Sequence, residues 1–263
     1  MKELWLVCDS SLYSELIDRN EQRVNAGEID FLLFPSEVFP FNSCKLPQVL
    51  HDRGEIEACV RTGFGLQTRL TGAFTDLAEV DPSHYDRIVV CSSGTANETM
   101  FECMICYFID SPIFLLCNDG HFEELTPEHQ EEMAMFYQRY TEQKQDVVAM
   151  IKGRNICIIP VLDFRIILTL LPAFHFEKIK EIVSCFKGGM DFDDQLHPLY
   201  VASLMKDLAC NGYVNVRSCD PSRPSEDLST ISLETFYSSY EVNTVSIEDQ
   251  ECHVKELKEK MTA

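Results

Sequence analysis

The chain has 263 residues, of which 45% are hydrophobic, so it is long enough for one large folded domain or two smaller ones. Its 43 acidic and 22 basic side chains give a formal net charge of −21. This charge argues against binding to nucleic-acid phosphates or to an anionic membrane surface, and it fits solubility or a basic partner.

The start of the chain predicts a protein of the reducing cytoplasm. MKELWLVCDSS has only a short apolar run before Asp9, unlike a signal or transit peptide, and no run approaches the roughly 20 apolar residues that cross a bilayer. All twelve cysteines are expected to be free thiols, because several lie in or at the end of apolar strand-like runs: Cys8, Cys91, Cys117 and Cys157.

No metal site is expected. Cys103 and Cys106 lie in a helix-period segment without a second Cys or His pair at zinc spacing, which favours core packing. The acidic turn with Asp191, Asp193 and Asp194 lacks the Gly and terminal Glu of a calcium loop, which favours a solvated turn.

The first half of the chain alternates strand-like and helix-like segments. Strands are expected at 4–8, 31–34, 88–91 and 113–116, and helices at 10–24, 46–51, 66–77 and 96–109. Strands that are apolar throughout and alternate with helices imply a parallel sheet buried on both faces. The fold class predicted for residues 1–119 is therefore α/β with a Rossmann-like parallel sheet.

The second half predicts a smaller, mainly helical domain at 120–219. TPEHQEEM opens a long exposed helix, with Thr126 as N-cap and Pro127 at the first helical position. HPLYVASLMKDLACNGYVNV has the outline of the end of a winged-helix module, yet Lys206 and Arg217 are its only cations, so DNA binding is not expected. Residues 220–263 are expected to form a polar linker and a charged C-terminal tail.

Polar residues follow the ends of the predicted strands. In an open parallel sheet, ligands bind outside the carboxyl ends of the strands. We therefore predict one ligand-binding crevice, lined by Asp9, Ser10, Ser93, Gly94, Thr95, Glu98 and Asn118. Ser, Asp and Asn are also common in strand-to-helix turns because they cap helices, so a purely structural role stays open.

The loop SSGTANE allows two interpretations. Gly94 can adopt backbone conformations closed to other residues, and free N–H groups at the start of the next helix would favour an anion. Thr95 and Glu98 also match the S/T-x-x-E capping box, which uses the same N–H groups. No G-x-S-x-G elbow or other pattern assigns a catalytic residue.

SGTANE, a helix and then SPIFLLC resemble the donor-binding segment of glycosyltransferases of the two-Rossmann-domain class. The resemblance implies that the turn faces a diphosphate and that Glu98 holds a ribose. It covers residues 93–117 only, its acid falls one position early, and no Arg or Lys lies in the loop. The chain is also too short for two such domains, so no glycosyl transfer is predicted.

Over a longer stretch the chain resembles uncharacterised bacterial proteins with a Rossmann-like N-terminal half and a helical C-terminal half. VCDSSLYSEL, the strand and helix from 87 to 109, and ELTPEHQEEM carry this resemblance. It implies a fold and no activity. Our functional hypothesis is binding of a small ligand, a nucleotide or phosphorylated metabolite, at the strand ends. The alternative is a non-enzymatic interaction protein whose acidic second half docks a protein partner.

Overall fold

A computed structural model describes residues 1–36, 39–60, 67–91, 94–116, 120–152, 155–170, 175–188, 196–220, 227–243 and 245–262. The chain forms two compact units, Met1–Lys144 and Gln145–Ala263. The boundary expected from the sequence lay near residue 119. In the structure, the long helix that follows Thr126 lies within the first unit.

The first unit is built on a five-stranded sheet with the order β2-β1-β3-β4-β5. Its strands are β1 (Glu3–Val7), β2 (Ile29–Leu33), β3 (Arg87–Cys91), β4 (Ile113–Leu116) and β5 (Phe122–Glu124). The first four strands are parallel, and β5 runs antiparallel to β4. The predicted parallel sheet is therefore confirmed. The sequence did not indicate β5, because Phe-Glu-Glu is too short for a periodic pattern.

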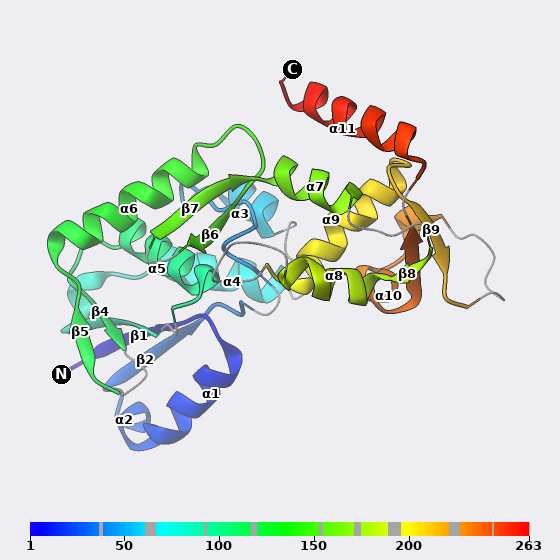
Figure 1. Cartoon of the computed structure of the whole chain (residues 1–263). Coiled ribbons are helices and arrows are strands. Elements are labelled where there is room, and N and C mark those ends of the chain that lie inside the picture. Colours follow the sequence, from blue (N-terminus) through cyan, green and yellow to red (C-terminus); the bar gives the residue numbers. More distant parts are fainter. Residues whose placement is uncertain are drawn as a thin grey trace. The chain divides into compact units, whose positions relative to one another are not determined.

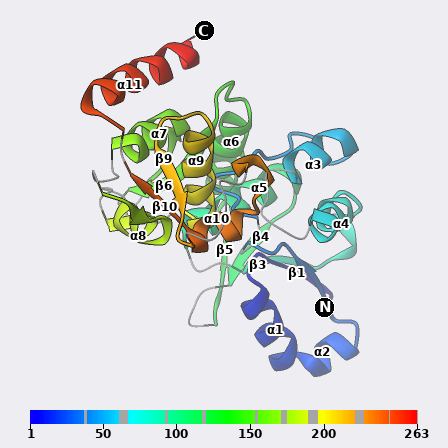
Figure 2. The same cartoon turned by 90° about the vertical axis from the view of Figure 1, so that its right-hand side faces the viewer.

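Helices cover both faces of this sheet (Figure 1). On one side lie α1 (Ser10–Arg19) and α2 (Glu21–Asn25), and on the other lie α4 (Gln67–Ala78), α5 (Ala96–Phe108) and α6 (Pro127–Thr141). Figure 2 shows the same two layers from the side. Side chains alternate between the two faces along a strand. Trp5 and Val7 therefore pack with Leu16 of α1, while Leu4 and Leu6 lie on the opposite face of the sheet.

A cluster of fully buried phenylalanines fills the face under α4 and α5. Its rings meet at centroid distances of 5.0 to 6.0 Å and come from Phe34, Phe39, Phe41, Phe74 and Phe101. Three of these rings, those of Phe34, Phe39 and Phe41, belong to the irregular segment that follows β2, so this segment forms part of the core.

The helix predicted at 46–51 is wrong, because that stretch is irregular and α3 (Arg53–Val60) begins only afterwards. Side chains of α6 hydrogen-bond to backbone carbonyls of this segment, in place of the bonds that a helix would form within itself. The Tyr137 hydroxyl donates to the Pro47 carbonyl at 2.6 Å, and the Tyr140 hydroxyl donates to the Cys44 carbonyl at 3.2 Å. A short 3-10 helix, η1 (Pro82–His84), leads into β3.

Helix α6 starts as predicted, with Thr126 as N-cap and Pro127 in the first turn. It is not exposed all round, because it packs along α5 and buries Met133, Tyr137 and Tyr140. The rings of Tyr107 and Tyr137 lie 5.0 Å apart. This contact holds α6 in the first unit.

The second unit begins with a hairpin and a helix and continues as a small α/β arrangement. Its elements are β6 (Val147–Lys152), β7 (Asn155–Pro160), α7 (Val161–Leu170), β8 (Glu177–Lys178), α8 (Ile179–Gly188), α9 (Pro198–Cys210), β9 (Asn215–Ser218), η2 (Leu228–Thr230), α10 (Leu233–Ser239), β10 (Tyr240–Asn243) and α11 (Ile247–Thr262). Strands β8, β10 and β9 form an antiparallel sheet in that order.

The second unit has the chain order β8, α8, α9, β9 and β10, with η2 and α10 inserted between β9 and β10. The winged-helix outline expected from the sequence stays a prediction. Helix α9 ends at Asn211, and Gly212 follows with a φ of 75°. Helix α10 and η2, which lie between β9 and β10, pack against α9. The Lys206 ammonium of α9 donates to the Ile231 carbonyl at 2.5 Å. These contacts hold η2 and α10 against α9.

The stretch expected to be a linker and tail also contributes to the core of the second unit. Phe236, Tyr240 and Val242 are buried, and Leu257 anchors the charged helix α11. The sequence did not predict this packing, because the apolar residues of this stretch stand singly or in pairs among Ser, Thr and Glu. No helix in the described ranges has the length and apolarity that a membrane span requires.

Candidate functional site

The strand order places the candidate site at the carboxyl ends of β1 and β3. The chain leaves β1 for β2 on one side, whereas β3 leads to β4 on the other. In open α/β sheets, such a reversal of strand order leaves a crevice at the carboxyl edge, between helices that cover opposite faces. Here α1 follows β1 and α5 follows β3, so both helices begin at this edge.

Asp9 and Ser10 lie where β1 passes into α1, as predicted. The Asp9 carboxylate accepts a hydrogen bond from the Leu12 backbone N–H at 2.6 Å and so caps α1. Ser10 is the first residue of that helix, and its carbonyl accepts a hydrogen bond from the Ser14 hydroxyl. Both Asp9 and Ser10 are half-buried. This cap by itself explains a short side chain with a hydrogen-bond acceptor at position 9.

Gly94, Thr95 and Glu98 lie where the chain enters α5. Gly94 has a φ of 87°, which disfavours other residues, although a Cβ there would meet no atom within 4 Å. Thr95 and Glu98 form a complete capping box. The Thr95 hydroxyl accepts from the Glu98 N–H at 3.3 Å, and the Glu98 carboxylate accepts from the Thr95 N–H at 3.0 Å. The capping interpretation of SSGTANE is thus present in the structure.

The thiol of Cys8, the residue after β1, shows which acids come together at this edge. Burial raises the pKa of the Cys8 thiol well above its usual value, and the negative charges of Glu98, Glu102 and Asp9 raise it further. Burial also raises the pKa of the Cys91 thiol, at the end of β3, to about 12. Both thiols are therefore protonated and weakly nucleophilic at neutral pH.

Sequence analysis missed Glu102. It lies four residues after Glu98, one turn along α5, and both side chains are only 8% exposed. The available signal was a pair of acids at helical spacing in a segment whose other residues are mostly apolar. With Asp9, these acids give the edge a negative character that would oppose a bare phosphate.

Ser93 and Asn118, the other two predicted site residues, lie outside the described residues, as do the predicted acidic turn residues Asp191, Asp193 and Asp194. Among the described residues, no group of three or more His, Cys, Asp or Glu side chains is arranged to hold a metal ion. The ten cysteines whose side chains are described are free, and Cys103 and Cys106 are buried, as predicted.

The residues at the carboxyl edge therefore combine two helix starts, two protonated thiols and three acids. Such a surface is suited to accept hydrogen bonds from the hydroxyl or amino groups of a ligand. Comparisons of this chain with protein-family models, with curated proteins and with solved structures found no match.

Proposed function

We propose that the first unit binds a small ligand, a nucleotide or related phosphorylated metabolite, at the carboxyl ends of β1 and β3. The observation that carries this proposal is the start of α1 and α5 from neighbouring strands at the reversal of strand order. Ligands of open α/β sheets bind at this place, and helix N-termini favour anions.

The acids and the helix starts would contact different parts of such a ligand. Glu98 and Glu102 would accept hydrogen bonds from ribose hydroxyls, since ionised carboxylates are acceptors only. A phosphate would have to lie by the helix starts, away from these acids, or bring a cation with it. The proposal therefore favours a nucleoside-containing ligand over inorganic phosphate.

A second function is favoured by the capping bonds. Asp9, Thr95 and Glu98 all take part in helix caps, which explains their presence without any ligand. On this alternative the sheet is a scaffold, and the protein acts through contacts with a protein partner at its acidic second half.

The test is a thermal shift screen of the full chain against nucleotides and sugar nucleotides. A ligand at about 100 times its Kd should stabilise the fold by roughly 2.7 kcal/mol. If no compound in the panel stabilises the parent protein, the ligand proposal fails and the scaffold alternative is preferred.

Two variants locate the binding of any ligand found. Gly94→Val should abolish the response, because the turn at the start of α5 must change conformation. Gly27→Val is the matched control: Gly27 has a φ of 70°, equal open space, and a position before β2 at the opposite edge.

Glu98→Gln should weaken the binding of a ribose-bearing ligand. Glu21→Gln, in the first turn of α2, should leave that binding unchanged. Parent-like binding by both Gly94→Val and Glu98→Gln would exclude this edge as the site.

A further inference from the structure

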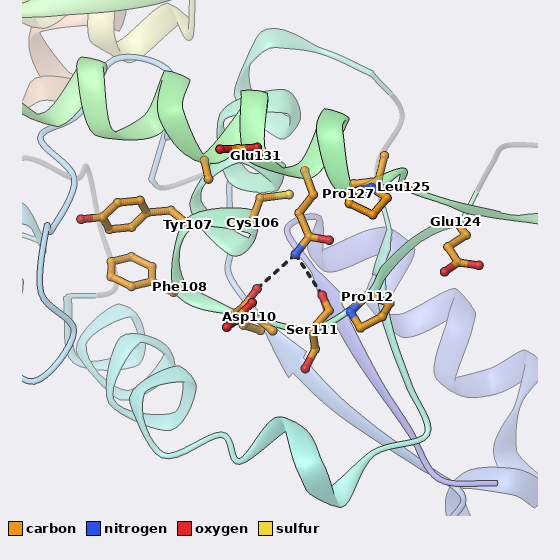
Figure 3. A pocket seen from close by; sticks show the side chains of 13 residues that line it. Cys106, Tyr107, Phe108, Asp110, Ser111, Pro112, Glu124, Leu125, Pro127 and Glu131 are labelled. Atoms are coloured by element: carbon orange, nitrogen blue, oxygen red, sulfur yellow. Dashed lines mark hydrogen bonds between the residues drawn. The ribbon is translucent and has the colours of Figure 1, made fainter.

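A cavity of about 550 Å³ lies at the amino edge of the sheet, between the end of α5 and the start of α6 (Figure 3). We call it the α5–α6 cavity. Its wall consists of the last turn of α5, the turn 109–112, the end of β5 with Leu125, and the first two turns of α6. Volumes of about 300–1,000 Å³ are typical of small-ligand sites.

Chain direction explains where the cavity forms. Helix α5 runs from the carboxyl edge to the amino edge, and the antiparallel β5 returns the chain to the same amino edge, where α6 begins. The Gln130 side-chain amide donates to the Ile109 carbonyl at 3.2 Å and to the Ser111 carbonyl at 2.9 Å. These two bonds, drawn in Figure 3, fix the turn against α6 and preform the cavity wall.

The lining combines apolar surface with charge of one sign. Cys106, Tyr107, Phe108 and Ala134 supply much of the apolar part. The charged side chains of the lining are all acidic: Asp110, Glu124 and Glu131. None of these three carboxylates forms a hydrogen bond or ion pair with another side chain in the described part of the structure.

We propose that the α5–α6 cavity binds an organic cation, an ammonium or guanidinium group on an apolar stem. The carboxylates attract the charge, and the apolar part of the lining offers contact to the stem. The chain's net charge of −21 would steer such a cation toward the protein. The cation belongs either to a free amine or to a Lys or Arg side chain of a partner.

The site is separate from the carboxyl edge, so its test is independent of the nucleotide proposal. Isothermal titration of the full chain uses 2-phenylethylammonium and its neutral analogue 2-phenylethanol. The cation should bind about tenfold more tightly, because the three carboxylates attract its charge and the alcohol carries none. The difference should shrink at high salt. Equal affinities, or no binding of either probe at millimolar concentration, would overturn the proposal.

Glu131→Gln should remove most of the preference for the cation. Glu132→Gln is the matched control, because this neighbouring exposed residue lies on the same helix, carries the same charge and does not line the cavity. Binding that drops equally in both variants would reflect net charge alone and would overturn the assignment to this cavity.

A third probe, Nα-acetyl-lysine methylamide, distinguishes the sources of the cation. If it binds as tightly as the free amine, the cavity accepts a lysine side chain of a protein partner. If only the free amine binds, the ligand is a small molecule. Each outcome supports cation binding and names its source.

Discussion

The carboxyl edge of the sheet and the α5–α6 cavity at its amino edge both gather acidic side chains, yet the fold uses them differently. At the carboxyl edge, Asp9 and Glu98 accept backbone hydrogen bonds that begin α1 and α5. In the cavity, Glu124 and Glu131 have no side-chain partner among the described residues. An acid whose structural role is visible needs no ligand to explain it, whereas unpaired acids around a preformed cavity do suggest one.

Glu3 is a buried acid with several partners, and we expect its removal to cause the largest loss of stability among the acids compared. Its side chain is buried and accepts from the Trp5 indole N–H at 2.9 Å, with Arg23 at 3.2 Å and Arg87 at 3.5 Å. Glu3→Ala should lower the free energy of unfolding by about 3 kcal/mol, because it leaves the buried Trp5 indole N–H without its acceptor and removes the carboxylate that pairs with Arg23 and Arg87. Urea unfolding measures this. Glu28→Gln, which alters a more exposed partner of Arg23, should cost less than about 1 kcal/mol. Equal losses in the two variants would show that burial of the acid does not determine how much stability its removal costs.

Raising the pH should affect both regions through their thiols. Burial raises the pKa of Cys91, at the carboxyl edge, and of Cys106, in the cavity wall, to about 12. The unfolded chain loses these protons first, so stability is full below pH 9 and falls as the pH rises toward 12. Urea unfolding should show a loss of about 2 kcal/mol for each of these thiols between pH 9 and 11.

Cys91→Ala and Cys106→Ala should each reduce this pH dependence. A stability that stays constant over this range, or rises, would contradict the burial of both thiols.

Glu98→Ala tests the carboxyl edge directly. It removes half of the capping box and should cost about 1 to 2 kcal/mol, with the loss concentrated at the start of α5. Hydrogen exchange of the amides in the first turn of α5 should rise accordingly. If those amides stay as protected as in the parent, the capping box does not stabilise this helix.

Glu131→Ala gives the smallest expected effect. Its carboxylate is exposed and unpaired among the described residues, so the free energy of unfolding should change by less than about 0.5 kcal/mol. A loss comparable to that of Glu98→Ala would mean that the cavity acids are structural after all, and would remove the contrast between the two regions.

The sequence by itself determined the parallel sheet and the helix starts. Apolar runs at 4–8 and 88–91 are buried strands because no other element of that length hides both faces. Thr95 with Glu98, and Thr126 with Pro127, begin helices because each cap uses groups only three or four residues apart. Such local signals are visible in a single sequence.

Tertiary structure decided the remaining features, because they depend on segments far apart in the chain. Pro47 stands in an irregular core segment since Tyr137, ninety positions later, bonds to its carbonyl. The unit boundary falls after Lys144 because α6 packs on α5. The cavity beside Glu131 exists because an antiparallel β5 returns the chain to the amino edge. Packing between distant segments, which no local periodicity encodes, places these groups together.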